Sequence, residues 1–530
     1  MSPAADLIIT NARVFTSNPS NPNAEAVAVK GNRIVYVGDR KGVENWRGVG
    51  TRHVDGQGNT LMPGFIDCHF HLLWGCIWLG SARLQEVKNQ NDLSEVLKTF
   101  AAENKSSLWV VGRGIKYGIV STRQELDAII PDRPVYVGAY DGHTAWANTR
   151  ALEMARVLHP GKEIGSNGII VRDDTGVATG ELREDDAMSV VHDLVPEPDG
   201  GRKRELLHLG MKQIAATGVT SVHNMNGDMA EMDMYTAAED TGKMLLRVYV
   251  SYWVRHDTTE AMLAEASQMK EIRGEYVRGG AVKFFMDGVW ESYTALTLAP
   301  YADDPEARSE GIWSLEDFTR MAAACDRLGL QIFVHCCGDG AVRRTLDGYQ
   351  AVQKLNGKRD SRHRVEHIEV IHPDDMPRFR QLDVIASMQA IHCPMSSDEA
   401  DVWLWRVGTQ RWPHAFAWRE IKNAGATLVF GSDWTVAPYN PMLGVYAALN
   451  RKKWAPDNPD QRPTLEETLI AYTRDAAYAE FQEDQKGQLK TGYLADLVLL
   501  SADIFQTPAE EIKEISPLLT MVNGRVTYEA

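Results

Sequence analysis

Two histidines, His69 and His71, stand at the end of the apolar segment GFIDCHFH and are the first residues whose spacing suggests chemistry. Side chains two positions apart on a strand point to the same face, so the two imidazoles would lie about one metal site apart. Taken alone, such a pair more often arises by chance or lies on the surface. The apolar strand, which follows Pro63-Gly64, strengthens the metal interpretation.

Four more residues of ligand type end other apolar or β-branched runs. A lone histidine at a strand end is more often a hydrogen-bonded structural residue than a ligand. An inward-facing lysine is harder to explain structurally, because burying its charge is costly unless the charge is removed or paired. The convergence of these residues with the histidine pair therefore predicts a metal site. The four residues are Lys283, His335, His367 and Asp433.

The elements that must position these residues are short apolar strands that alternate with helical segments from residue 64 onward. This alternation predicts an α/β fold with a parallel sheet, and eight strands close a (β/α)₈ TIM-like barrel with its active site at the carboxyl ends of the strands. Ser314 and Thr464 are predicted to begin two of the helices. The eight strand segments are GFIDCHFH, TSVHNM, LRVYVSYW, AVKFFMDG, QIFVHCCG, RVEHIEV, IASMQAIH and TLVFGSDW.

Both ends of the chain, residues 1–63 and 485–530, are rich in β-type residues and carry Gly31-Asn32 and Asn523-Gly524 turn signals. We expect them to form one small β-sandwich domain beside a barrel of residues 64–484. About 150 residues separate the first two barrel strands, far more than one helix needs, so residues of about 75–205 form an insertion on the barrel rim. That insertion contains the hairpin-like segment NGIIVRDDTGVATGEL.

The composition is that of a globular protein of 530 residues, with 44% apolar and 24% charged residues. Its net charge of −16 comes from scattered acidic residues without a Lys/Arg cluster, which argues against nucleic acid or membranes as partners. The N-terminal stretch lacks a basic region before its short apolar run, so we expect a cytoplasmic protein. Six cysteines without a Cys-x-x-Cys pair indicate neither a disulfide framework nor a zinc ribbon.

The motifs PGFIDCHFH, AVKFFMDG, FVHCCGDGAV, RVEHIEV and GSDWTVAPYNP resemble those of the amidohydrolase superfamily. The resemblance is to its amidohydrolase-3 branch, which includes N-substituted formamide deformylases, and it covers essentially the whole chain. It implies a metal-dependent hydrolase that cleaves an amide-type C–N bond in an N-acyl, N-formyl or cyclic amide substrate.

The resemblance also assigns roles to the predicted ligands. His69, His71 and Asp433 would hold the more buried of two divalent metal ions. His335 and His367 would hold the second. Carboxylated Lys283 would bridge the two ions. Zinc is the expected metal because imidazoles dominate the site, although such sites also accept manganese, cobalt or iron.

The chemistry implied is attack by a hydroxide that bridges the two ions, since metal binding brings the pKa of water near neutrality. Asp433 would act as general base and then as general acid, taking the proton and delivering it to the departing nitrogen. His143, in the segment DGHTAWANTRAL, is a candidate for polarising the scissile carbonyl.

Further residues are candidates for the substrate pocket, each with packing as the alternative interpretation. Arg113 and Tyr117 are weaker candidates, and Trp403, Trp405 and Trp412 cluster between the last two strands. Tryptophans at a barrel mouth would favour an apolar or aromatic substrate group, unless they only anchor loops. The pocket candidates are Trp74, Trp146, Asn148, Glu181, Asp287, Trp290, His392 and Trp434.

Three alternatives stay open to different degrees. The same site could act on a lactone, carbamate or phosphoester. A deaminase is disfavoured, because adenosine-type deaminases carry a glutamate soon after the fifth-strand histidine, where His335 is followed by Cys-Cys-Gly-Asp. A non-catalytic scaffold would be expected to have lost ligands. The sequence leaves the oligomeric state open and allows a homodimer.

Overall fold

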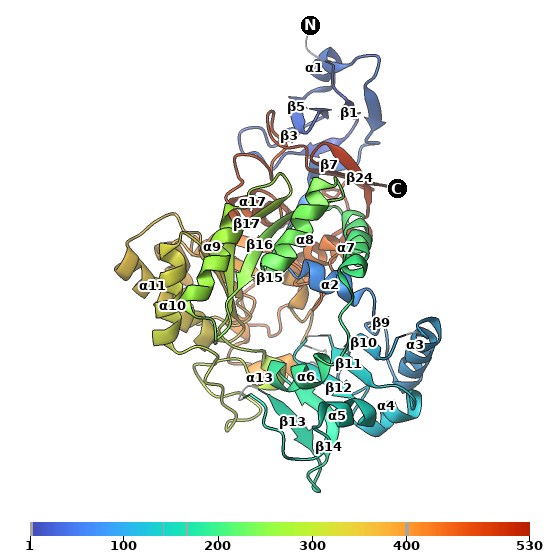
Figure 1. The fold of residues 1–530 in the computed structure, drawn as a ribbon. Coiled ribbons are helices and arrows are strands. Elements are labelled where there is room, and N and C mark those ends of the chain that lie inside the picture. Colours follow the sequence, from blue (N-terminus) through green and yellow to red (C-terminus); the bar gives the residue numbers. More distant parts are fainter. Residues whose placement is uncertain (1–3, 106, 141, 166–167, 398–401) are drawn as a thin grey trace. The chain divides into compact units, whose positions relative to one another are not determined.

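The computed structural model describes residues 4–105, 107–140, 142–165, 168–397 and 402–530, which form two compact units (Figure 1). Unit 1 comprises Met1–His71, Met211–Asp433 and Pro438–Ala530, and unit 2 comprises Leu72–Gly210 and Trp434–Ala437. Within the described ranges, no helix has both the length and the apolar character that crossing a bilayer requires.

Unit 1 contains the predicted eight-stranded barrel. Its strands pair in parallel in chain order from β8 to β21, and each of the eight predicted segments overlaps one of them. The last and first strands are in contact, and Asp433 N donates to His69 O at 2.8 Å where the barrel closes. The strands are β8 Phe65–Phe70, β15 Val219–Gly227, β16 Arg247–Trp253, β17 Val277–Phe285, β18 Gln331–Cys336, β19 Arg364–His367, β20 Ile385–Met388 and β21 Leu428–Phe430.

Helices connect successive strands, and the two predicted helix starts are confirmed. Ser314 caps α10 by accepting from Asp317 N, and Thr464 caps α16 by accepting from Glu467 N. The helices are α7 Gly200–Ala215, α8 Met229–Asp240, α9 Leu263–Glu271, α10 Leu315–Arg327, α11 Asp339–Asn356, α12 Met376–Gln381, α13 Val402–Val407, α14 Trp418–Asn423, α15 Pro441–Asn450, α16 Leu465–Ala471 and α17 Arg474–Ala479.

The two ends of the chain form two further sheets in unit 1, drawn in blue and red in Figure 1. The predicted turns at Gly31-Asn32 and Asn523-Gly524 connect β4 to β5 and β23 to β24. Apolar residues of both sheets, such as Val27 and Leu497, share one buried cluster, while the predicted β-sandwich arrangement stays a prediction. The strands are β1 Leu7–Thr10, β4 Ala26–Lys30, β5 Arg33–Gly38 and β6 Arg52–Asp55 in one sheet, and β2 Arg13–Phe15, β3 Asn23–Ala24, β7 Thr60–Pro63, β22 Leu497–Leu500, β23 Pro517–Val522 and β24 Arg525–Glu529 in the other.

Unit 2 holds the segment expected as an insertion, and it has a sheet and cores of its own. Alternate side chains of β11, a strand in the interior of this sheet, point to opposite faces. Val135 and Val137 belong to one apolar cluster, and Tyr136 belongs to another. Helices α3 and α4 pack on the first cluster, and α5 and α6 pack on the second. The elements are α2 Leu72–Trp78, β9 Ala82–Arg83, α3 Gln90–Glu103, β10 Val110–Ile115, α4 Arg123–Ile129, β11 Val135–Ala139, β12 Thr144–Ala147, α5 Thr149–Ala155, β13 Ile169–Arg172, β14 Ala178–Arg183 and α6 Asp185–His192.

A buried ion pair joins the barrel to Asp496, the residue before β22 in the second of the two sheets formed by the chain ends. Arg247, the first residue of β16, donates through Nε to Asp496 Oδ2 at 2.6 Å and through Nη2 to Asp496 Oδ1 at 3.0 Å. Burial opposes ionisation of Asp496, but the Arg247 charge and hydrogen bonds hold the pKa of this carboxyl below its usual value. The pair therefore contributes stability only while both partners are present.

Replacing Arg247 by methionine should strongly destabilise unit 1, because it leaves the Asp496 carboxylate buried without its cation. We expect a loss of about 3–5 kcal/mol in the free energy of unfolding. Arg13→Met is the matched control, since the Arg13 pair with Asp503 is 39% exposed on the arginine side and should cost about 1 kcal/mol or less. Denaturant titration compares the two variants, and equal losses would contradict the structural role of the buried pair.

Candidate metal centre

The rim of the barrel is held together where β8 meets the segment that follows β21. Asp67 Oδ1 accepts from His69 N at 3.1 Å and from Ser432 N at 3.0 Å, so one carboxylate binds both backbone segments. Gly431 allows this approach, because a Cβ there would lie 2.5 Å from His69 N. The hydrogen bonds thereby fix His69 and Asp433 opposite one another.

Three predicted ligands form a compact cluster at this rim. One ligand atom from each of His69, His367 and Asp433 lies within 4.8 Å of the others, and all three residues are buried. Asp433 Oδ1 is 3.5 Å from His69 Nε2 and 3.1 Å from His71 Nε2. The carboxylate therefore faces both members of the histidine pair, as the strand alternation of β8 predicts.

The remaining predicted histidines join this cluster. The His335 and His367 ring centroids are 4.4 Å apart, and those of His69 and His367 are 4.6 Å apart. His392, a predicted pocket residue in the short turn Ala390–His392, stacks almost parallel to His367 and places Nε2 4.0 Å from Asp433 Oδ2. Four imidazoles, those of His69, His71, His367 and His392, thus lie 3.1–4.0 Å from the Asp433 carboxylate, and His335 lies beside His367.

The backbone at two ligand positions lies in the left-handed region. His367 has φ 70°, its neighbour Ile368 has φ 49°, and Asp433 has φ 58°. This conformation is uncommon for residues other than glycine and is a real outlier for β-branched Ile368. Such conformations cost about 1–3 kcal/mol each and persist where the surrounding structure imposes them, often at functional sites.

Lys283 lies on β17 and is completely buried. Among the described residues its Nζ has no hydrogen-bond partner and lies 4.2 Å from the centre of the Phe285 ring. Burial lowers the pKa of Lys283 to about 8, although the fields of Glu366 and Asp433 act to raise it. A substantial fraction of its amine is therefore neutral near physiological pH.

The protonation states of the cluster suit metal ligation. Burial lowers the pKa of both His69 and His367 well below the usual range, so their rings are neutral and can offer a lone pair. Burial alone would raise the pKa of Asp433, but the adjacent His69 imidazole and the hydrogen bond from His71 hold it well below its usual range. Asp433 is thus an anionic oxygen donor beside neutral nitrogen donors.

Each of three imidazoles has a hydrogen-bond acceptor at its Nδ1 atom. Glu366 Oε2 is 2.7 Å from His69 Nδ1, Asp287 Oδ1 is 3.2 Å from His335 Nδ1, and Gln389 Oε1 is 2.7 Å from His367 Nδ1. With the proton on Nδ1, the opposite ring nitrogen, Nε2, keeps the lone pair that a metal ion would bind. Sequence reasoning missed Glu366, Gln389 and Asp67, and it proposed Asp287 for the substrate pocket.

The donor set fits a divalent metal ion. Neutral imidazole nitrogens with carboxylate oxygen are the ligands of zinc and similar ions. The described part of the chain leaves His367 Nε2 buried without a hydrogen-bond partner, an arrangement that is costly unless another group satisfies the nitrogen. The geometry therefore supports a metal centre at this rim.

Unit 2 contains the other predicted catalytic residue, His143. Its Nδ1 lies 2.9 Å from Glu184 Oε2, and Glu184 N donates to His143 O at 2.8 Å. Glu184 precedes α6 with φ 61° and ψ 165°, and its side chain contacts His143 without capping the helix. Glu184 was not predicted, because nothing in the sequence marks a glutamate in a glycine-type conformation.

Several predicted pocket residues pack within unit 2. Asn148 is buried, caps α5 and donates to Ile130 O and Arg133 O. The buried Trp146 packs against Tyr117, and Glu181 pairs with Arg183 at 2.6 Å. The assignment of these residues to a substrate pocket stays a prediction. Arg113 stacks on Trp78 at 4.1 Å and donates to His192 at 2.6 Å.

The predicted tryptophans differ in exposure. Trp74 is 41% exposed and packs edge-on against Trp78, whereas Trp434 is 7% exposed and covers Gly75, where a Cβ would lie 2.3 Å from its ring. Trp290, in unit 1, is fully buried, and its indole N–H donates to Cys337 O. Trp74 is therefore the most exposed of Trp74, Trp290 and Trp434, although Trp405 is 57% exposed.

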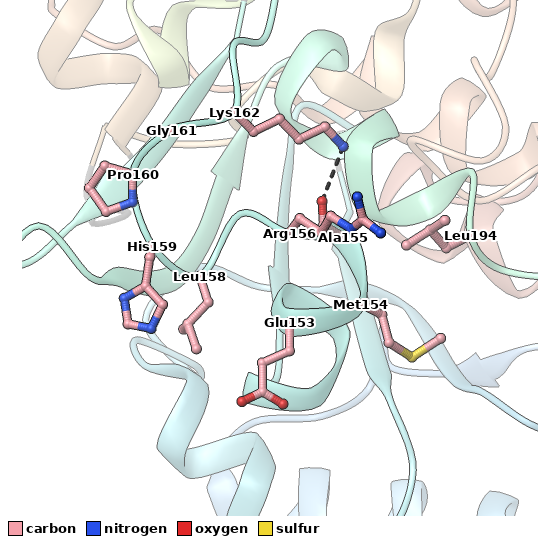
Figure 2. A pocket seen from close by; sticks show the side chains of 10 residues that line it. All are labelled: Glu153, Met154, Ala155, Arg156, Leu158, His159, Pro160, Gly161, Lys162 and Leu194. Carbon is pink, nitrogen blue, oxygen red and sulfur yellow. Dashed lines mark hydrogen bonds between the residues drawn. The ribbon is translucent and has the colours of Figure 1, made fainter.

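A surface pocket of about 870 Å³ lies in unit 2 around the end of α5 (Figure 2). Lys162 reaches across it and donates to Ala155 O at 3.1 Å. Its walls also include the exposed side chain of Met154. None of the predicted catalytic, metal or pocket residues lines it, so it is not the candidate site.

Comparison with known proteins identifies the family. The amidohydrolase family model matches residues 52–528, which is nearly the whole chain. The chain belongs to the amidohydrolase family. This confirms the resemblance carried by the strand-end motifs.

The similar proteins agree with this membership along the whole chain. The chain is 32% identical to Protein LONG AFTER FAR-RED 3 of Arabidopsis thaliana, covering 99% of this chain and 92% of that protein. It is 27% identical to N-substituted formamide deformylase of Arthrobacter pascens, covering 100% and 99%. An uncharacterized metal-dependent hydrolase of Pyrococcus horikoshii OT3 superposes with a TM-score of 0.74 at 26% identity, covering 93% and 96%. The predicted barrel fold of this amidohydrolase is thereby confirmed.

The conformation of Glu184 predicts an unusual order of stability. Glu184→Gly and Glu184→Ala both remove the contact with His143, but only glycine occupies this backbone region without strain. We therefore expect the glycine variant to be more stable than the alanine variant by about 1–3 kcal/mol. Thermal unfolding of the two variants measures the difference. An alanine variant that is the more stable of the two would contradict strain at this position.

Proposed function

We propose that this protein is a metal-dependent hydrolase that cleaves an amide-type C–N bond, with Asp433 carrying the proton. The observation that carries the proposal is the buried cluster of His69, His367 and Asp433, whose ligand atoms lie within 4.8 Å of one another at the barrel rim. The carboxyl ends of barrel strands are where enzymes of this fold place their active sites.

We infer a centre for two divalent ions, with zinc as the expected metal. His69, His71 and Asp433 would hold one ion, and His335 and His367 the other. Such ions supply Lewis acidity, polarise a carbonyl oxygen and lower the pKa of water. The assignment is supported by the neutral imidazoles and the ionised carboxylate of the cluster.

Lys283 is proposed to bridge the two ions as a carbamate. The buried ammonium would first lose one proton. Its neutral amine nitrogen would then attack CO₂, forming an N–C bond and releasing a second proton, so that a buried cation becomes an anion. The proposal is supported by the lowered pKa of about 8 and by the buried Nζ atom, which has no hydrogen-bond partner in the described ranges. A carbamate replaces an unpaired buried positive charge with two oxygen donors, which removes the cost of burying the cation.

Asp433 is proposed to act as base and then as acid. Water adds its oxygen to the scissile carbonyl and loses a proton to Asp433, and the same proton passes to the nitrogen as the C–N bond breaks. The products are a carboxylic acid and an amine, so one water molecule is consumed. An amide nitrogen is a poor leaving group without that proton. His143, held by Glu184, is proposed to polarise the carbonyl oxygen.

The choice of an amide-type bond is supported by the likeness to N-substituted formamide deformylase along the full length of both chains. Exposed Trp74 supports a substrate with an apolar or aromatic group. A lactone, carbamate or phosphoester would use the same donor set. Cytoplasmic location, a homodimer, and the absence of nucleic-acid and membrane partners stay predictions.

Asp433→Asn should reduce kcat by about 10²–10⁴-fold, because asparagine retains the shape of the side chain but cannot carry the proton. Steady-state kinetics on the purified, folded variant measures the loss, and thermal unfolding controls for the fold. Turnover close to that of the wild-type protein would show that another group carries the proton.

A substrate screen tests the bond assignment. The screen compares N-formyl and N-acyl amines with lactones, carbamates and aryl phosphoesters on the metal-loaded protein. We expect the highest kcat/KM for an N-formyl or N-acyl amine that carries an aromatic group. Amide turnover at background beside rapid cleavage of an ester-type bond would exclude the amide assignment and leave the hydrolase assignment standing.

A further inference from the structure

We propose that Glu366, Asp287 and Gln389 set how strongly three imidazoles bind a metal ion. Each does so through the charge that it places beside the Nδ1 atom of its histidine. We call this effect the grading of the ligands. His69 and His335 have carboxylates in this position, whereas His367 has a neutral amide. The inference rests on the proposed metal centre and deepens it. It makes His335 the strongest of the three ligands, and it makes His69 dependent on Glu366, because this carboxylate offsets the Arg364 charge behind it.

All three contacts select the same tautomer. An acceptor oxygen at Nδ1 requires the proton on that nitrogen, and the lone pair of the ring then lies on Nε2. Nε2 of His69 is the nitrogen that faces Asp433, at 3.5 Å. Nε2 of His335 lies 3.6 Å from Cys337 Sγ, and Nδ1 of His367 lies 3.8 Å from Asp433 Oδ2. The three acceptors thus select the same tautomer, and they differ in charge.

The charge behind His69 is itself held by a buried arginine. Arg364 donates to Glu366 through Nε at 2.7 Å and through Nη2 at 3.0 Å, and both residues are fully buried. Arg364 also donates to His223 at 2.8 Å and to Ser387 at 2.9 Å. Glu366 consequently orients His69 and at the same time neutralises a cation that would otherwise repel metal ions.

The charge behind His335 has a different support. Asp287 is fully buried and accepts from three backbone N–H groups, those of Leu296, Cys337 and Gly338, at 2.9–3.1 Å. These amides fix the carboxylate without contributing a full positive charge. Asp287 therefore places a net negative charge behind His335, where it raises the electron density of the ring and strengthens the bond to a cation.

Gln389 offers only the dipole of its amide. It follows β20 and is buried, with its Oε1 atom 2.7 Å from His367 Nδ1. A glutamate at this position would have the same shape and would bring a negative charge behind His367. Without metal that charge would be buried and costly, whereas bound metal would compensate it, so the substitution should raise metal affinity.

The test is Zn²⁺ affinity of the metal-stripped protein, measured by competition with a chelator. We expect Glu366→Gln to weaken Zn²⁺ binding about 10–100-fold, because it removes the charge and leaves Arg364 uncompensated. Gln389→Glu should strengthen binding by about tenfold. Glu483→Gln is the matched control, since it also removes a glutamate paired with an arginine, Arg362, through contacts of 2.8 and 2.9 Å. Its Zn²⁺ affinity should equal that of the wild-type protein.

A lower Zn²⁺ affinity of Glu366→Gln together with a higher affinity of Gln389→Glu supports the grading. A loss of Zn²⁺ affinity in both variants would show that the contacts only orient the imidazole rings. The absorption spectrum of the Co²⁺-loaded protein gives a second readout, and it should change in Glu366→Gln and stay unchanged in Glu483→Gln. A wild-type protein that binds no Zn²⁺ would overturn the proposed function together with the grading.

If Gln389→Glu does not fold, Gln389→Met replaces it in the test. Glu366→Gln keeps an acceptor at Nδ1 but loses the charge, whereas Gln389→Met loses the acceptor and changes no charge. Grading by charge predicts the larger loss of Zn²⁺ affinity for Glu366→Gln. A larger loss for Gln389→Met would overturn the proposal.

Discussion

The hydrogen bonds of the Asp67 carboxylate connect the first strand of the barrel to the segment that follows the last. They bind the backbone beside His69 and beside Asp433, two residues that are 364 positions apart in the chain. Burial raises the pKa of Asp67 to about 7, which shows how strongly this carboxylate is removed from solvent. The proposed metal centre lies where these two segments meet, so its geometry depends on this closure.

Below the rim, the interior of the barrel is unusually rich in charge. His223 links Arg364 to Glu480, whose carboxylate lies 2.7 Å from Lys486 Nζ and 3.4 Å from His223 Nε2. Burial opposes ionisation of Glu480, yet the Lys486 charge holds its pKa near 2. Each of these three buried charges, on Arg364, Glu480 and Lys486, thus has a partner of opposite sign or a histidine beside it. Lys283 differs, because no hydrogen-bond partner of its amine is found in the described ranges.

Much of this structure could be predicted from local sequence patterns. The strands were recognisable because each is a short apolar run, and the ligands were recognisable because they end such runs. Glu366 and its contact with His69 could not be predicted from these patterns. Strict alternation along β19 directs Arg364 and Glu366 into the barrel and would direct His367 outward, but the left-handed backbone at His367 turns this side chain to the centre as well. A non-glycine residue in that conformation leaves no mark in the sequence.

The structure of unit 2 was harder to predict from the sequence for a related reason. The length of the segment indicated an insertion. The order of its strands and the contact of Glu184 with His143 could not be predicted, because they depend on tertiary packing. Side chains such as Asn148 and Trp146 carry motif-like spacing, and in the structure they cap a helix and fill a core. Motif spacing alone does not separate ligand-binding residues from residues that hold a loop.

The most direct test of the account is a crystal structure of the protein grown with Zn²⁺, with anomalous diffraction recorded on either side of the zinc absorption edge. The account predicts anomalous density within about 2.0–2.2 Å of imidazole nitrogens and carboxylate oxygen at the rim, with His69 and Asp433 on one ion and His367 on the other. Density confined to other residues, or no ordered ion at full zinc occupancy in solution, would contradict it.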